Sequence, residues 1–379
     1  MIQNNQDKKM ITAICPELTK MSKIELLQRC KELNITHCSK KNKTLLKESI
    51  LERISLEKEN TGIKEINSVM FKKKRIVSLF AGCGGLDFGF INNNNYSHVL
   101  VNDFDINACN TYEQNFKIKP VCCDIKELVG IPDCDLIIGG FPCQGFSMAN
   151  PFRNEDDKRN ELYVEILRVV GEKKPSYFLL ENVKGILNMG GYDTIEDKKN
   201  KTGKIFKNIL GELSKCGYNV SFKLFEIKLY GVPQKRERVI IIGVRNDINF
   251  NPRWPEPSNN NIITLKDAIG DLPLDYNKDI QHIGTKHKCA VTGYLGNREL
   301  KWDEPSPTIT GRGGGSGGPV IHNHPSLKRR LTVRECARIQ TFPDTFTFDG
   351  SVSSMYRQLG NAVPCKFSEY LSTIFQDAP

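Results

Sequence analysis

The segment FPCQGFS, residues 141–147, contains a cysteine that could carry out covalent chemistry. The run DLIIGG before it, residues 135–140, predicts a short buried strand ending in two glycines. Pro142 fixes the backbone and removes a donor, so the chain must leave the sheet just before Cys143. Open α/β sheets bind ligands at the carboxyl ends of their strands, which favours a nucleophile. A buried structural thiol fits these seven residues equally well, because free cysteine is among the most buried residue types.

A second segment, VSLFAGCGGLDFGF at 77–90, predicts a strand, a glycine-rich turn and a helix. Glycines let the backbone approach a ligand closely, and the helix N-terminus presents free N–H groups. The spacing by itself indicates a nucleotide-like cofactor only weakly, since it is neither GxGxxG nor a P-loop. The expected cofactor contacts in this segment are Phe80, Gly82, Gly84, Gly85 and Leu86.

Acidic residues follow the next two predicted strands. Asp103 in NDFD lies where doubly wound folds bind ribose hydroxyls, and Phe104 beside it could stack on a purine. Asp124 and Ile125 in CCDI lie at a third strand tip. Each carboxylate could instead cap a turn or a helix. The glycine-rich turn and the two acidic tips together favour a cofactor site.

These segments alternate with helical patterns along the chain. The strand-like runs are RIVSLFAG, SHVLVNDF, DLIIGGFP, SYFLLENV and RVIIIGV, and the helix-like ones include ELYVEILRVVGEK and KIFKNILGELSKCG. The alternation predicts an α/β fold, with a doubly wound, mainly parallel sheet. A further helix is expected in TVRECARIQTF, where Thr332 can cap and Glu335 follows three residues later.

The motifs taken together resemble those of the DNA (cytosine-5)-methyltransferases. The family's motifs occur here in their usual order as FAGCGGLDFGF, GGFPCQGFS, ENV, QKRERVIIIG, RLTVRECARIQTFPDTF and GNAVP. The similarity covers roughly residues 74–379. It implies the Rossmann-like methyltransferase fold, S-adenosyl-L-methionine as methyl donor, S-adenosyl-L-homocysteine as product, and double-stranded DNA as substrate.

The resemblance also assigns the catalytic roles. A thiolate that adds to carbon 6 of cytosine makes carbon 5 electron-rich, and the family's thiolate corresponds to Cys143. Glu181 in ENV would hydrogen-bond or protonate N3, although it could simply cap a helix. Arg238 in QKRER would contact the cytosine and Arg236 would orient the site. Alternate residues of a strand share one face, so we expect Arg236 and Arg238 to lie on the same side of a strand. Two guanidinium groups near Cys143 would favour its thiolate form. Alternatively, the two arginines belong to a solvated cluster of charges. The sequence identifies no base for the carbon 5 proton.

A base inside a duplex cannot reach these groups, so the target must flip out, at a cost of about a few kcal/mol. Residues 144–160 resemble the family's loop that closes over the flipped base. The segment TITGRGGGSGG resembles its recognition loops, with Arg312 as the candidate guanine contact. The expected DNA contacts are Gln144, Ser147, Asn182, Val183, Thr310, Arg312, Gly313 and Gly314. Pro142, Asn361 and Val363 are expected to border the donor.

Charge and cysteine usage add two expectations. The chain of 379 residues carries +10, and residues 1–75 hold 17 basic against 9 acidic side chains. This excess favours a polyanionic partner, although a solvated surface would show it too. The 13 cysteines contain no CxxC pair, so we expect reduced thiols and no metal.

We expect five regions. The pattern of residues 1–60 predicts a helix–loop–helix with helix caps at Ser22 and Asn42. It resembles the SAP-type DNA-binding module, and an ordinary amphipathic helical hairpin is the alternative. A linker covers 61–73, the catalytic domain 74–250, a target-recognition domain 251–330, and a C-terminal segment at 331–379 returns to the catalytic domain.

The expected function is sequence-specific DNA methylation, as the modification half of a restriction–modification system with a cognate endonuclease. We expect a monomer in the reducing cytoplasm, associated with the nucleoid, with no membrane span and no secretory signal. A tRNA-directed methyltransferase and a donor-binding DNA regulator without catalysis remain as alternatives.

Overall fold

The computed structural model describes residues 22–32, 42–43, 45–46, 49–50, 73–141, 162–257, 262–285, 300–311, 322–327 and 329–379. The chain divides into two compact units, Met1–Lys72 and Lys73–Pro379. None of the helices within the described ranges is long and apolar enough to cross a membrane.

The first unit contains helix α2 (Lys23–Glu32). Ser22 caps this helix, because its hydroxyl accepts from the Glu25 N–H at 3.3 Å and the Glu25 carboxylate accepts from the Ser22 N–H at 2.5 Å. Such a reciprocal pair satisfies two N–H groups that the first turn leaves free. The Asn42 side chain accepts in the same way from the Leu45 N–H at 2.9 Å. Both predicted caps are therefore present.

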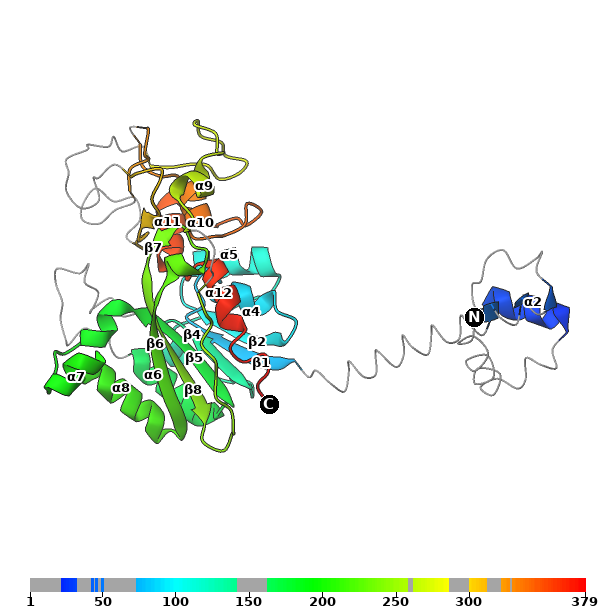
Figure 1. Ribbon diagram of the computed structural model, residues 1–379, viewed down its shortest axis with the longest axis horizontal. Helices are drawn as coiled ribbons and strands as arrows, with labels where there is room; N and C mark the ends of the chain where they lie inside the picture. Colours follow the sequence, from blue (N-terminus) through cyan, green and yellow to red (C-terminus); the bar gives the residue numbers. More distant parts are fainter. Residues whose placement is uncertain are drawn as a thin grey trace, which may run out of the picture. The chain divides into compact units, whose positions relative to one another are not determined.

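The second unit is built on a seven-stranded sheet (Figure 1). From edge to edge the strands are β3 (Val121–Cys122), β2 (Tyr96–Asp103), β1 (Lys74–Leu79), β4 (Leu136–Gly139), β5 (Tyr177–Val183), β8 (Glu237–Arg245) and β6 (Tyr218–Glu226). The five strands from β3 to β5 are mutually parallel, whereas β8 is antiparallel to both β5 and β6. The mainly parallel α/β fold is confirmed.

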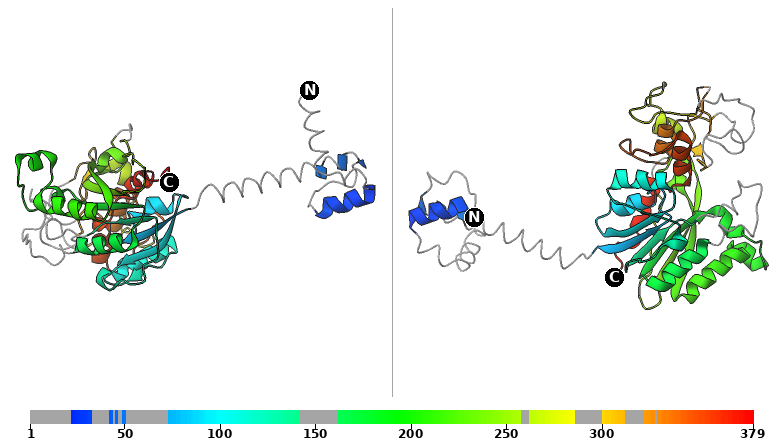
Figure 2. Two further views of the ribbon diagram at one scale, coloured as in Figure 1. Left: turned by 90° about the horizontal axis from the view of Figure 1, so that it is seen from below. Right: turned by 180° about the vertical axis from the view of Figure 1, so that it is seen from behind.

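Both faces of the sheet are covered, as a parallel sheet requires. On one face, Val77 and Ile137 pack with residues of α6 (Leu162–Lys173) and α8 (Lys204–Lys215). On the other, Ile76 and Ile138 pack with residues of α4 (Asp87–Ile91) and α12 (Cys365–Ser372). Neighbouring strand residues thus point to opposite faces, each into its own core. Figures 1 and 2 show these helices on the two sides.

Further helices, 3₁₀ turns and a second pair of strands complete this unit. They are α5 (Ile106–Phe116), α7 (Ile195–Asn200), α9 (Leu265–Ile269), α10 (Val333–Ile339), α11 (Val352–Asn361), the 3₁₀ turns η2 (Ile125–Glu127), η4 (Lys184–Asn188) and η5 (Ile227–Tyr230), and a two-stranded parallel pair of β7 (Gln234–Lys235) with β9 (Ser306–Pro307). Helix α10 begins with the predicted capping box between Thr332 and Glu335.

The C-terminal segment packs on the first βα unit. The Ser368 hydroxyl accepts from the Gly89 N–H at 2.9 Å, and the Tyr96 hydroxyl donates to the Ser372 carbonyl at 2.6 Å. A side chain at Gly89 would come within 2.3 Å of the Ser368 backbone, so only glycine allows α4 and α12 to approach so closely. This packing brings the turn before α12 to the carboxyl ends of the strands.

Candidate active site

The glycine-rich turn between β1 and α4 is a tight loop. Phe80, Gly82 and Gly84 all have positive φ, at 54°, 56° and 88°, which favours glycine at the latter two. The Gly82 N–H donates to the Asp103 carboxylate at 2.7 Å. An added Cβ at Gly84 would overlap the Tyr112 and Phe116 rings of α5. The turn is therefore held from two sides, by the tip of β2 and by α5.

Asp103 and Phe104 lie at the tip of β2. The Asp103 carboxylate is buried and also accepts from the Asp105 N–H at 2.9 Å. Burial raises the pKa of Asp103, and the N–H donors of Asp105 and Gly82 oppose that rise. Phe104 is unusual for an aromatic residue because it is 71% exposed. The tip thus offers a carboxylate and a bare aromatic face next to the glycine-rich turn.

Asp124, at the third predicted strand tip, caps the 3₁₀ turn η2. The Asp124 side chain caps η2 by accepting from the Lys126 N–H at 3.0 Å, and Ile125 is buried in the core. The sequence left two roles open for this carboxylate, a cofactor contact or a cap. The contact observed is the cap.

A buried ion pair lies where β5 and β8 adjoin. Arg238 Nε is 2.6 Å from Glu181 Oε1, with 10% and 11% of the two side chains exposed. Neither atom has a hydrogen-bond partner elsewhere in the described part of the chain. Burial lowers the pKa of Arg238, and the Glu181 charge opposes that change. A guanidinium remains charged near neutral pH, so the pair places a cation beside the Glu181 carboxyl group.

The ion pair borders the end of β4. An added Cβ at Gly140 would lie 3.1 Å from Glu181 Oε2. The Asn182 side chain donates to the Phe141 carbonyl at 3.2 Å, and Val183 is half-buried. The Glu181 carboxylate therefore lies against the residues that immediately precede Pro142 in the sequence.

Arg236 does not share a strand with Arg238, so that expectation is wrong: β7 ends at Lys235 and β8 begins at Glu237. The fully buried Arg236 guanidinium instead donates to the carbonyls of Ile309 at 3.0 Å, Gly360 at 3.1 Å and Ala362 at 3.0 Å. Burial lowers its pKa. One cation thereby ties together three separate segments of the chain.

The GNAVP turn is the meeting point of those segments. A Cβ on Gly85 would lie 2.3 Å from the Val363 carbonyl oxygen, so the glycine-rich turn touches GNAVP. A Cβ on Gly360 would lie 2.1 Å from Thr310, and one on Gly311 would lie 2.1 Å from Asn361 Oδ1. The start of the TITGRGGG segment and the expected donor contacts Asn361 and Val363 are therefore neighbours.

Two glutamines at this junction were missed by sequence reasoning. The Gln234 side chain donates to Gln340 Oε1 at 2.7 Å and accepts from the Ile309 N–H at 3.0 Å. Gln340 donates in turn to the carbonyls of Leu359 and Ala362. Gln234 opens the QKRER motif, which was the available signal, but nothing local in the sequence identifies its partner.

Seven predicted site residues lie outside the described ranges: Pro142, Cys143, Gln144, Ser147, Arg312, Gly313 and Gly314. Within those ranges, no group of three or more histidine, cysteine or acidic side chains could hold a metal ion.

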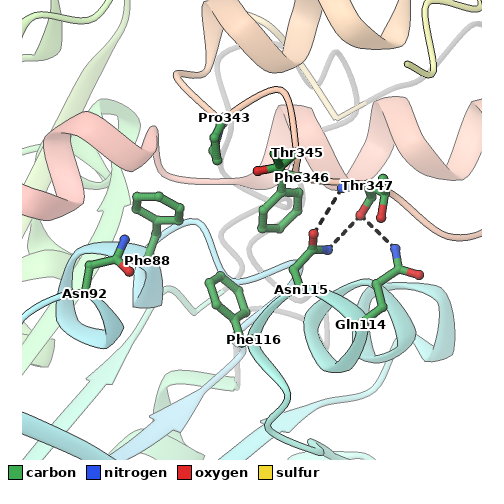
Figure 3. A pocket seen from close by; sticks show the side chains of 9 residues that line it. All are labelled: Phe88, Asn92, Gln114, Asn115, Phe116, Pro343, Thr345, Phe346 and Thr347. Atoms are coloured by element: carbon green, nitrogen blue, oxygen red, sulfur yellow. Dashed lines mark hydrogen bonds between the residues drawn. The ribbon is translucent and has the colours of Figure 1, made fainter. Parts of the chain in front are cut away.

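A pocket of about 340 Å³ lies between α4, α5 and the loop before α11 (Figure 3). Asn115 and Gln114 close one side by donating to the Thr347 carbonyl, both at 2.7 Å. None of the predicted site residues lines this pocket, which includes Phe88, Phe116 and Phe346. The candidate active site is therefore defined by contacts at the strand ends and not by this cavity.

Comparison with known proteins gives consistent matches. Residues 74–374 match the family model of the C-5 cytosine-specific DNA methylases. The chain is 38% identical to the type II methyltransferase M.NgoFVII of Neisseria gonorrhoeae, over 80% of this chain and 86% of that protein. It is 34% identical to M.BsuRI of Bacillus subtilis, over 85% and 84% of the two chains. The crystal structure of the S. pombe Dnmt2 methyltransferase has a similar fold, with a TM-score of 0.58 and 21% identity over 80% of this chain and 99% of that one.

Proposed function

The chain belongs to the C-5 cytosine-specific DNA methylase family, and on that premise we propose that it methylates carbon 5 of cytosine within a specific double-stranded DNA sequence, using S-adenosyl-L-methionine. It is thus a DNA (cytosine-5)-methyltransferase. The type II methyltransferases among its relatives support a role as a modification enzyme, paired with a restriction endonuclease.

The strand tips fit the methyl donor. Each oxygen of a carboxylate can accept more than one hydrogen bond, so Asp103 can hold ribose hydroxyls while keeping its bonds to Gly82 and Asp105. The exposed Phe104 ring can stack on the adenine. A Cβ at Gly82 would meet nothing within 4 Å, so there is open space beside the turn. When bound, the donor supplies an electrophilic methyl group on sulfur.

The buried ion pair is the single observation that carries the catalytic proposal. The Cys143 thiolate adds to carbon 6 of the flipped cytosine, and negative charge then builds over O2 and N3 of the ring. Arg238 donates to the base carbonyl, and Glu181 serves N3 by a hydrogen bond or a proton. Both side chains are already paired 2.6 Å apart and largely desolvated, which strengthens their action on a developing charge.

The reaction closes by elimination. After carbon 5 has taken the methyl group, a base removes the carbon 5 proton, the carbon 5–carbon 6 double bond re-forms and the Cys143 sulfur leaves. Arg236 takes no part in these bond changes. We assign it to positioning, because it fixes the GNAVP turn and the start of the recognition segment relative to β8.

The test uses purified protein with labelled donor and either genomic DNA or tRNA, followed by bisulfite sequencing of the DNA. We expect label in DNA alone, with 5-methylcytosine confined to one short sequence. Cys143→Ser should abolish transfer. Label in tRNA alone would overturn the DNA assignment, and full transfer by Cys143→Ser would overturn the covalent mechanism.

A further inference from the structure

Two thiols lie against the backbone of Asp103 and Phe104. Cys109, on α5, donates its S–H to the Asp103 carbonyl with sulfur and oxygen 3.6 Å apart. Cys122, on β3, donates to the Phe104 carbonyl across 3.8 Å. Cys122 is also the register partner of Asp103 in the parallel β2–β3 pairing. Consecutive carbonyls of one strand tip thus hold both sulfur atoms close together.

The two thiols also influence each other. Burial raises the pKa of the Cys109 thiol, and the neighbouring Cys122 thiol raises it further. Their surroundings differ, since Cys109 is 4% exposed whereas Cys122 is exposed to solvent. An accessible thiol beside a protected one is the arrangement in which a first oxidation at the surface is resolved by an inner partner.

The neighbouring Cys123 is a natural comparison. Its sulfur lies 3.5 Å from the Asn102 amide, and the carbonyls of Asp103 and Phe104 are bonded by the other two thiols. Adjacent residues of an extended segment point to opposite sides, which accounts for the different partners of Cys122 and Cys123.

We propose that Cys109 and Cys122 are an oxidation site, and that the disulfide between them lowers the affinity for the methyl donor. The proposal rests on the proposed function, because it takes Asp103 and Phe104 to be the ribose and adenine contacts. It assigns a modification to residues that the methyl-transfer mechanism does not use.

The oxidation balances with a peroxide as oxidant. The Cys122 thiol attacks one peroxide oxygen, the O–O bond breaks, and a sulfenic acid and one water form. The Cys109 thiol then attacks the sulfenic sulfur, the S–S bond forms and a second water leaves. Two thiols lose two electrons and two protons in total, and one hydrogen peroxide becomes two waters.

The disulfide would disturb the strand tip directly. Both S–H donors disappear, so the Phe104 carbonyl loses its bond from Cys122, and the Asp103 carbonyl keeps only the bond from the Cys123 N–H at 3.2 Å. The new covalent link joins α5 to β3 across that same tip. A displacement that costs the donor one good hydrogen bond corresponds to about a tenfold weaker affinity.

The experiment uses the full chain carrying Cys143→Ser, so that the nucleophile cannot be the oxidised group. This protein is treated with hydrogen peroxide, linked peptides are identified by mass spectrometry, and S-adenosyl-L-homocysteine binding is measured by calorimetry before and after. We expect a Cys109–Cys122 link, an affinity about tenfold weaker, and recovery with dithiothreitol. Adding Cys122→Ser should abolish both effects, whereas adding Cys123→Ser should leave both intact.

Three outcomes would overturn the proposal: no such link, a link with unchanged affinity, or an equal loss in the Cys122→Ser protein. If reduced protein binds the ligand and the linked protein binds it equally well, this inference fails alone. If even the reduced protein does not bind the ligand, the donor assignment of the proposed function fails with it.

Discussion

Replacing Gly85 by alanine should separate the glycine-rich turn from the GNAVP turn. The added Cβ would lie 2.3 Å from the Val363 carbonyl oxygen, 3.0 Å from the Ala362 Cβ and 3.1 Å from the Val363 nitrogen. Ordinary contacts begin at 3.4 Å, so relieving the shortest one requires a shift of about 1 Å. Backbone surrounds the site, so no flexible side chain can absorb the shift.

The magnitude follows from this overlap. Overpacking of this kind costs about 1–3 kcal/mol, which should appear as a lower free energy of unfolding. The same displacement moves the turn expected to hold the donor, and loss of one or two hydrogen bonds corresponds to a donor affinity about 10- to 100-fold weaker.

The assay compares Gly85→Ala with Gly211→Ala in urea denaturation and in calorimetry with S-adenosyl-L-homocysteine. Gly211 lies on α8, and an added Cβ there would meet nothing within 4 Å. Alanine is the better helix former by about 1 kcal/mol, so this control should be at least as stable as wild type and bind normally. A folded Gly85→Ala protein that binds the ligand as well as the control does would refute the assignment of the two turns to the donor site.

Glu181→Gln should reduce kcat about 100-fold or more in a methyl-transfer assay while leaving donor binding unchanged, since the ion pair acts on the cytosine; equal kcat would contradict this. Arg236→Met should lower the free energy of unfolding in urea by about 2–6 kcal/mol, because the buried Ile309 and Gly360 carbonyls lose their donor at about 1–3 kcal/mol each, whereas the Ala362 carbonyl keeps its bond from Gln340; a change within error would contradict it. Burial lowers the pKa of His282. Burial alone would raise the pKa of Glu335, but the Arg329 guanidinium bonded to it outweighs this effect and lowers that pKa. Because both pKa values fall on folding, the unfolded chain binds protons more tightly. The stability that these two groups contribute should therefore be complete above pH 6.5 and decline as the pH falls below 6.5 and then 4.5; thermal unfolding measured as the pH is lowered through this range checks this, and a rise in stability would contradict it.

Local sequence patterns predicted most of the sheet. The apolar runs around Val77, Ile137 and Ile240 became β1, β4 and β8, because each run carries its own burial signal. The helix start at Thr332 was equally local, since a capping box is complete within four residues.

The parts that were missed depend on distant partners. Strand β6 has a mixed burial pattern with exposed Asn219, and its place at the sheet edge is set by antiparallel pairing with β8. Gln234 and Gln340 are 106 residues apart, and Arg236 bonds carbonyls 73 to 126 residues away. Sequence spacing cannot reveal such contacts. The QKRER motif was therefore recognised from the sequence, but the distant residues that Gln234 and Arg236 hold in place were not.

The central claim is that a thiol of this chain becomes covalently bonded to the target cytosine. It is tested most directly with duplex DNA carrying 5-fluorocytosine at the sequence found by bisulfite mapping, because fluorine blocks the final elimination. With S-adenosyl-L-methionine present, wild type should form a DNA adduct that survives a denaturing gel, and Cys143→Ser should form none. If wild-type protein that methylates the normal duplex yields no adduct on the fluorinated one, the covalent mechanism is wrong.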